Sequence, residues 1–335
     1  MNKIGKLVLL VPSVLSVRLV RPVRLVGLVG LAGLIGCANM AEQLAHTRHS
    51  AAHVRSEMLV TTHWLNDNLN NPHLVVVHVA RTRQGYDAGH VPGARFMGWS
   101  DFATTRSGVP NELPPVADLV SLVRRLGIDE HSRVIAYDEG AGLEAARAYV
   151  TFDYLGLADR AALLDGHWKK WKAEARPVST TAPLVRPSTF TPRVNSAIIV
   201  SFEEMRKLVD AKRKSPRAGP AIIDARPEAQ YAGKEAGEGV RRGGHIPGAA
   251  NVCWAGNVVS EADPVMRSAP ELRATYDKAG VKPGDRVVTY CRTGVMASHD
   301  YFTQKYLGYD PRLYDGSYYE WSAQKDTAIA TGEKP

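Results

Sequence analysis

Short runs of aliphatic and β-branched residues alternate along the chain with segments whose apolar residues recur at helical spacing. The runs are bounded by turn residues, a pattern typical of strands buried on both faces of a parallel sheet, and they cover 75–79, 134–137, 222–224 and 287–290. Helical spacing is clearest at 117–126 and 202–209. This alternation predicts an α/β fold in which parallel sheets are covered by helices.

The same landmarks occur twice in one order. Each half has an arginine, a tyrosine and a Gly-His-x-Pro-Gly-Ala turn, namely Arg81, Tyr86 and 89–94 in the first and Arg226, Tyr231 and 244–249 in the second. The apolar runs that end at Tyr137 and Tyr290 also match, as do two later Asp-Gly pairs that are each followed by a tryptophan. This order indicates an internal duplication. The second copy has a longer segment before its Gly-His turn, rich in Gly, Glu and Arg, which we expect to be a loop.

The chain of 335 residues has room for about two domains of ordinary size. A proline-rich stretch between the two copies is predicted to be a linker. The predicted organisation is a signal peptide at 1–36, a tether at 37–60, a first domain at 61–176, the linker at 177–197, a second domain at 198–325 and a C-terminal tail at 326–335.

The first residues are typical of a targeting segment. A basic stretch without acidic residues is followed by apolar and small residues at 25–36 and then by Cys37. The apolar run is shorter than the roughly 20 residues of a transmembrane helix and fits the apolar part of a secretory signal. Leu34-Ile-Gly-Cys37 resembles a bacterial lipobox, which implies lipidation of Cys37, export, and anchoring on the periplasmic side of a membrane. Ala38 favours the outer membrane; an uncleaved anchor and a misassigned start codon remain alternatives.

Composition narrows the functional classes. Five basic residues of the targeting segment account for most of the net charge of +8, and the rest of the chain has no long basic run, so nucleic-acid binding is not expected. His46, His49 and His53 have spacings that could place them on one helix face, but no second ligand cluster accompanies them. We therefore expect no metal site.

The main candidate for chemistry is Cys291, which directly follows the predicted strand 287–290. The segment Cys291-Arg-Thr-Gly-Val-Met-Ala-Ser298 leads into a predicted helix, so the thiol is expected at a helix N-terminus, where free N–H groups favour an anion. Such a setting is expected to lower the pKa of the thiol. Arg292 adds a positive charge, and Gly294 allows the loop to curl with its amides inward.

Together, the Gly-His-Ile-Pro-Gly-Ala turn, Cys291-Arg-x-Gly-Val-x-Ala297 and Tyr314-Asp-Gly-Ser-x-x-Glu-Trp321 resemble tandem-domain rhodaneses over about residues 61–325. The resemblance implies a sulfurtransferase without a metal or organic cofactor. Cys291 would take a sulfane sulfur from thiosulfate or 3-mercaptopyruvate as a persulfide and pass it to cyanide or a thiol. The loop residues that would surround the small anionic donor are Arg292, Thr293, Gly294, Val295 and Met296. Arg226 either lines the same cleft or ties a strand end to its loop.

Several positions sharpen this interpretation. Phosphatases with a related loop need arginine where this chain has Ala297, so phosphate chemistry is not expected. The first copy has Asp138 at the position of Cys291, which predicts that its domain is catalytically inactive, with a general-acid role for Asp138 as the alternative.

The donor is less clearly marked: Arg292 favours thiosulfate, whereas Thr293 and Met296 depart from the residues that many thiosulfate enzymes have at these positions. A 3-mercaptopyruvate enzyme and a low-turnover persulfide relay therefore remain alternatives. Cys253 is expected to be a packed thiol, although it could resolve a persulfide.

Overall fold

The computed structural model describes residues 53–216 and 218–335. The predicted signal peptide and the predicted lipidation site, Cys37, lie outside these residues. Within the described ranges no helix is long and apolar enough to cross a membrane, and no group of three or more His, Cys, Asp and Glu side chains is placed to hold a metal ion.

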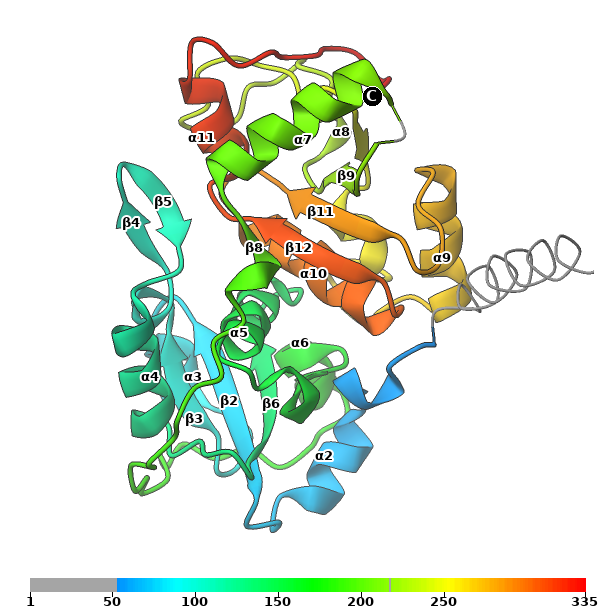
Figure 1. Ribbon diagram of the computed structural model, residues 1–335. Helices are drawn as coiled ribbons and strands as arrows, with labels where there is room; N and C mark the ends of the chain where they lie inside the picture. The colour runs from blue at the N-terminus through cyan, green and yellow to red at the C-terminus, as the bar shows by residue number, and fades with distance from the viewer. Residues whose placement is uncertain (1–52, 217) are drawn as a thin grey trace, which may run out of the picture. The chain divides into compact units, whose positions relative to one another are not determined.

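The first domain is built on a parallel five-stranded sheet (Figure 1). Its strand order is β1 (Leu59–Val60), β7 (Ala161–Leu164), β6 (Arg133–Asp138), β2 (Leu74–Ala80) and β3 (Arg95–Gly98). An antiparallel hairpin of β4 (Thr104–Arg106) and β5 (Val109–Glu112) extends from it. The helices of this domain are α2 (Thr62–Asn68), α3 (Gln84–Ala88), α4 (Val116–Arg125), α5 (Leu143–Tyr154) and α6 (His167–Ala173).

The second domain repeats this order. Its parallel sheet runs β8 (Ile199–Val200), β12 (Asp310–Tyr314), β11 (Arg286–Tyr290), β9 (Ala221–Asp224) and β10 (Ala249–Asn251). Its helices are α7 (Phe202–Lys214), α8 (Glu228–Tyr231), α9 (Ala269–Lys278), α10 (Val295–Tyr306) and α11 (Ser317–Ala323). The four predicted strands fall within β2, β6, β9 and β11, and the two predicted helices correspond to α4 and α7, so the predicted α/β architecture is confirmed.

The repeated Gly-His turn is held in the same way in both domains. The ring of His90 stacks on Tyr86 with centroids 3.9 Å apart, and its Nδ1 lies 2.7 Å from the Tyr86 carbonyl oxygen. In the second domain, His245 stacks on Tyr231 at 3.8 Å and its Nδ1 lies 2.9 Å from the Tyr231 carbonyl oxygen. The shared landmarks of the sequence therefore mark equivalent structural positions.

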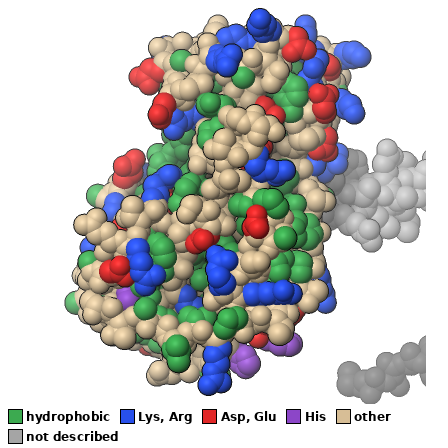
Figure 2. All heavy atoms as spheres, turned by 90° about the vertical axis from the view of Figure 1, so that its left-hand side faces the viewer, with side chains coloured by type: hydrophobic (Ala, Val, Ile, Leu, Met, Phe, Trp, Pro, Cys, Tyr) green, Lys and Arg blue, Asp and Glu red, His purple; other side chains and the backbone are tan. Residues whose placement is uncertain are grey.

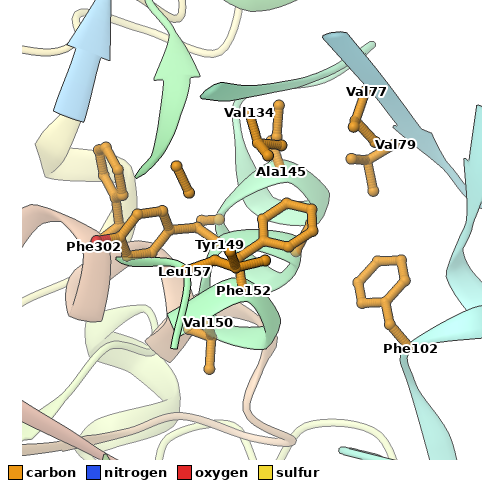
Figure 3. Packing of buried hydrophobic residues seen from close by; sticks show 14 of the residues in the cluster. Val77, Val79, Phe102, Val134, Ala145, Tyr149, Val150, Phe152, Leu157 and Phe302 are labelled. Atoms are coloured by element: carbon orange, nitrogen blue, oxygen red, sulfur yellow. The ribbon is translucent and has the colours of Figure 1, made fainter. Parts of the chain in front are cut away.

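The two domains share one hydrophobic core. Helix α5 packs on β2, β6 and β7, α10 packs on β11 and β12, and the two helices pack against each other (Figure 1). Both helices are buried on nearly all sides, as expected for helices between two sheets. Figure 3 shows Tyr149 of α5 beside Phe302 of α10, whose ring centroids are 5.0 Å apart in an edge-to-face arrangement. Aromatic pairs of this kind add about 0.5–1.5 kcal/mol to the stability that area burial gives.

The ends of the predicted tether and tail pack onto the domains. Ser56–Met58 forms a short 3-10 helix with Met58 in the core, and β1 pairs in parallel with β7. The predicted tether at 37–60 therefore extends too far, because these few residues are too short to show a periodic pattern. In the predicted tail, Ala330 exchanges backbone hydrogen bonds with His245. On the face shown in Figure 2, Lys and Arg are interspersed with Asp, Glu and apolar side chains.

Candidate active site

The Cys291 loop connects β11 to α10 at the carboxyl end of the second sheet, where open parallel sheets place their ligands. Gly294 caps α10 with a φ of 81°. A Cβ at this position would lie 2.6 Å from Asp315 Oδ1 and 3.1 Å from the Asp315 carbonyl oxygen. Glycine is thus required both for the left-handed backbone and for the close approach of the loop that follows β12.

That following loop fixes the shape of the Cys291 loop through its backbone. The hydroxyl oxygen of Ser317 accepts hydrogen bonds from the N–H of Cys291 at 3.2 Å and the N–H of Gly294 at 3.0 Å. The same hydroxyl donates to the carbonyl oxygen of Tyr314. In addition, the N–H groups of Tyr318 and Tyr319 donate to the carbonyl oxygens of Cys291 and Arg292, each at 2.9 Å. The beginning of α11 therefore holds the loop in one conformation.

The thiol of Cys291 has no exposed surface and lies among backbone N–H groups. Burial raises the pKa of the thiol, while hydrogen bonds from the N–H groups of Ala297, Thr293 and Met296 lower it. The sequence predicted a lowered pKa, and that prediction is wrong for the net effect, because the desolvation that accompanies full burial exceeds the contribution of the amides. The cradle of amides is nevertheless present, and it favours an anionic sulfur over a neutral one.

The other predicted site residues have different surroundings. Arg292 is partly exposed and its guanidinium reaches Glu238, whereas the hydroxyl of Thr293 is buried and accepts a hydrogen bond from Asn111 Nδ2 at 3.0 Å. Val295 begins α10, and Met296 packs against the shared core. Cys253 is half-buried near the end of β10, and burial raises the pKa of its thiol.

Arg226 has the structural role that the sequence left open. It is fully buried, and its guanidinium donates to both carboxylate oxygens of Asp224, with the shortest distance being 2.6 Å. It also donates to the carbonyl oxygen of Gly244 at 2.7 Å, and its guanidinium carbon lies 4.0 Å from the ring centroid of Tyr318. Arg226 therefore ties the end of β9 to the Gly-His turn and to α11, and a place for it among the donor-binding residues is not supported.

The equivalent loop of the first domain contains a carboxyl group in place of the thiol. The Asp138 carboxylate is buried and accepts hydrogen bonds from the N–H groups of Gly140 at 2.9 Å, Gly142 at 3.1 Å and Ala145 at 3.1 Å. Burial raises the pKa of this carboxyl, and the backbone donors oppose the increase. Because Asp138 occupies the place of Cys291 in the repeat, the cradle of the first domain is filled by a side chain that cannot bind a sulfane sulfur.

Contacts from the first domain support the Cys291 loop, and sequence reasoning did not find them. Arg147 of α5 forms a bidentate ion pair with Asp315, with distances of 2.6 and 3.0 Å, and both side chains are buried. Asp315 also accepts a hydrogen bond from the N–H of Leu113, just after the β4–β5 hairpin. The Asp-Gly repeat marked Asp315 in the sequence, but nothing marked Arg147 or Asn111, since their partners are far away along the chain.

Comparison with known proteins is consistent with this arrangement. The model of the family described as rhodanese-like domain matches residues 61–174 and 201–324. The sulfur carrier protein TtuD of Thermus thermophilus is 33% identical over 289 residues, covering 83% of this chain and 98% of the relative. A thiosulfate sulfurtransferase of Corynebacterium glutamicum is 31% identical over 291 residues, covering 83% and 91%.

A solved structure shows the same fold. SseA from Escherichia coli, whose crystal structure was presented with the rhodanese fold and catalytic mechanism of 3-mercaptopyruvate sulfotransferases, has a TM-score of 0.67 to this chain at 25% identity. The likeness covers 78% of this chain and 98% of SseA. With two matched domains and relatives that align over nearly their whole length, the chain belongs to the rhodanese family of sulfurtransferases and contains two rhodanese-like domains in tandem.

Proposed function

We propose that Cys291 carries a persulfide and that the second domain transfers sulfur from thiosulfate to a thiol or cyanide. The observation that carries this proposal is the position of Cys291 at the carboxyl end of β11, in a loop that Ser317 holds and that leads directly into α10, so that backbone N–H groups surround the Cys291 sulfur. The first domain gives an internal comparison, since its equivalent cradle binds the carboxylate of Asp138 through three N–H donors. In both domains, therefore, backbone N–H groups of the loop point at the side chain that follows the strand, Asp138 in the first domain and Cys291 in the second.

The proposed reaction consists of two displacements. The Cys291 thiolate attacks the outer sulfur of thiosulfate. A bond forms between the Cys291 sulfur and this outer sulfur, and sulfite leaves with the electron pair of the broken S–S bond of thiosulfate. An acceptor thiolate or cyanide then attacks the terminal sulfur of the persulfide, which yields an acceptor persulfide or thiocyanate and returns the Cys291 thiolate. Both steps exchange one nucleophile for another, so no metal, organic cofactor or external oxidant takes part.

Donor choice is proposed to depend on Arg292. A guanidinium can give the sulfonate end of thiosulfate two charge-assisted hydrogen bonds, and the Arg292 side chain is partly exposed beside the buried Cys291. We expect thiosulfate to be preferred over 3-mercaptopyruvate. Arg292→Gly should lower kcat/KM for thiosulfate roughly ten- to a hundredfold, because a lost charged hydrogen bond costs about 1.5–3 kcal/mol.

The measurement is kcat/KM for both donors in the wild type, in Arg292→Gly and in Arg186→Gly, an exposed arginine of the linker that serves as control. The control should match the wild type. A wild type that favours 3-mercaptopyruvate, or an Arg292→Gly variant with unchanged thiosulfate efficiency, would contradict the assigned role of Arg292.

A persulfide relay is the second candidate, and the complete burial of the Cys291 thiol favours it. A buried persulfide is protected from small nucleophiles, and a sulfur carrier protein is among the relatives. Steady-state assays with both donors distinguish the two functions. Rapid turnover supports the enzyme, whereas stable persulfide formation with slow turnover supports a module that passes its sulfur to a partner.

The first domain is proposed to be catalytically inactive, so Asp138→Asn should leave sulfur transfer per folded molecule within a few-fold of the wild type. The substitution replaces one carboxylate oxygen with an NH₂ group that faces backbone donors, so we expect a loss of about 1–3 kcal/mol in unfolding free energy. Transfer assays and urea unfolding of the same preparation check both effects. A hundredfold loss of transfer in a folded variant would show that Asp138 takes part in the reaction.

A further inference from the structure

Arg292 already has an anionic partner in this structure. Its Nη1 donates to the carboxylate of Glu238 at 3.0 Å and to the carbonyl oxygen of the same residue at 3.2 Å. The Glu238 side chain is 90% exposed and that of Arg292 31%. An ion pair with so much exposed surface is weak, and an anionic ligand can therefore displace the carboxylate.

The segment 233–242, which contains Glu238, lies in the region that makes the second copy longer than the first. Gly237 and Gly239 flank Glu238 with φ values of 83° and 73°. A Cβ on Gly239 would lie 2.6 Å from the Tyr319 ring, and one on Gly237 would lie 3.5 Å from Arg292 Cδ. Left-handed glycines on both sides thus let the backbone approach the Cys291 loop closely and present Glu238 to Arg292.

The segment is fixed to the second domain at its far end. Arg242 donates from Nε to the carbonyl oxygen of Ser322 at 3.0 Å, and from Nη1 to the carbonyl oxygen of Thr327 at 3.0 Å. Nearer to the site, the N–H of Tyr319 donates to the carbonyl oxygen of Arg292. Glu238 is therefore held beside Arg292 by a segment that is anchored on α11 and on the residues after it.

We propose that Glu238 is a specificity-determining residue that acts through Arg292 and disfavours dianionic donors relative to monoanionic ones. This inference rests on the proposed function, in which Arg292 binds the anionic end of the donor. The Glu238 carboxylate occupies guanidinium hydrogen bonds that a sulfonate would use. It also offsets the positive charge of Arg292, and the attraction that the donor loses is larger for thiosulfate, a dianion, than for 3-mercaptopyruvate, a monoanion.

The test is Glu238→Gln, which removes the charge and keeps the size of the side chain. We expect kcat/KM for thiosulfate to rise roughly two- to fivefold through a lower KM, with kcat unchanged, and the value for 3-mercaptopyruvate to rise less. Glu235→Gln, an exposed acidic residue of the same segment, is the matched control for a change in net charge. In an Arg292→Gln background, Glu238→Gln should no longer change the preference between donors.

A binding measurement makes the test independent of turnover. In Cys291→Ser protein, calorimetry should show thiosulfate binding more tightly by the same roughly two- to fivefold factor after Glu238→Gln, and not after Glu235→Gln. Equal effects of the two substitutions, or a gain that persists without Arg292, would overturn the inference. Failure of the proposed function has a different signature, because Cys291→Ser would then transfer sulfur as well as the wild type.

Discussion

Cys291→Ser is expected to abolish sulfur transfer with either donor, and the loss should be complete. The proposed mechanism needs an atom that can form a bond to a second sulfur and then release it, and a serine hydroxyl cannot do this. The substitution is nearly isosteric, and the backbone hydrogen bonds of position 291 to Ser317 and Tyr318 do not involve the side chain. The variant should therefore fold like the wild type and bind the donor without consuming it.

Cys253→Ser is the matched control, since Cys253 is the other free thiol in the described part of the chain. It should keep transfer within a few-fold of the wild type. Initial rates of thiocyanate formation from thiosulfate and cyanide measure both variants, and circular dichroism verifies their fold. Residual turnover in Cys291→Ser, combined with a large loss of sulfur transfer in Cys253→Ser, would show that Cys253 is the catalytic cysteine.

Arg147→Met is expected to destabilise the protein by about 3–5 kcal/mol, the usual cost of removing one partner of a buried ion pair. Asp315 would remain buried without the Arg147 guanidinium, and its carboxylate would keep only the hydrogen bond from the N–H of Leu113. The loop that carries Ser317 would also lose its contact with α5. Because Ser317 fixes the N–H groups of Cys291 and Gly294, sulfur transfer should fall as well.

Urea unfolding of Arg147→Met and of Arg125→Met measures this effect. Arg125 forms an exposed ion pair with Asp101 at 3.2 Å, and such pairs contribute about 0.2–1 kcal/mol, so the control should unfold close to the wild type. If Arg147→Met unfolded at the same urea concentration as Arg125→Met, the ion pair with Asp315 would not be a significant link between the domains.

The parts of the fold that the sequence predicted are those set by short-range patterns. Buried parallel strands appear as apolar runs, and the repeated turns and Asp-Gly pairs revealed the duplication. The position of Cys291 between β11 and α10 followed from the order of strand, glycine-containing loop and helix. The amide cradle was predictable for the same reason, because its donors are all within a few residues of the thiol.

The remaining features depend on contacts between distant residues. Asn111 meets Thr293, Arg147 meets Asp315 and Glu238 meets Arg292 only after both copies have folded. The raised pKa of Cys291 has the same origin, since the burial that causes it involves packing from both domains, whereas the sequence shows only the local amides. Arg226 was ambiguous because one arginine after a strand fits a ligand contact and a structural brace equally well.

The mass of the protein after reaction with thiosulfate tests most directly whether the sulfur atom of Cys291 carries the transferred sulfur. Intact-protein mass spectrometry should show the gain of one sulfur atom, peptide mapping should place it on the segment that contains Cys291, and addition of cyanide should remove it. An unchanged mass, or a sulfur found on Cys253 in place of Cys291, would contradict the account.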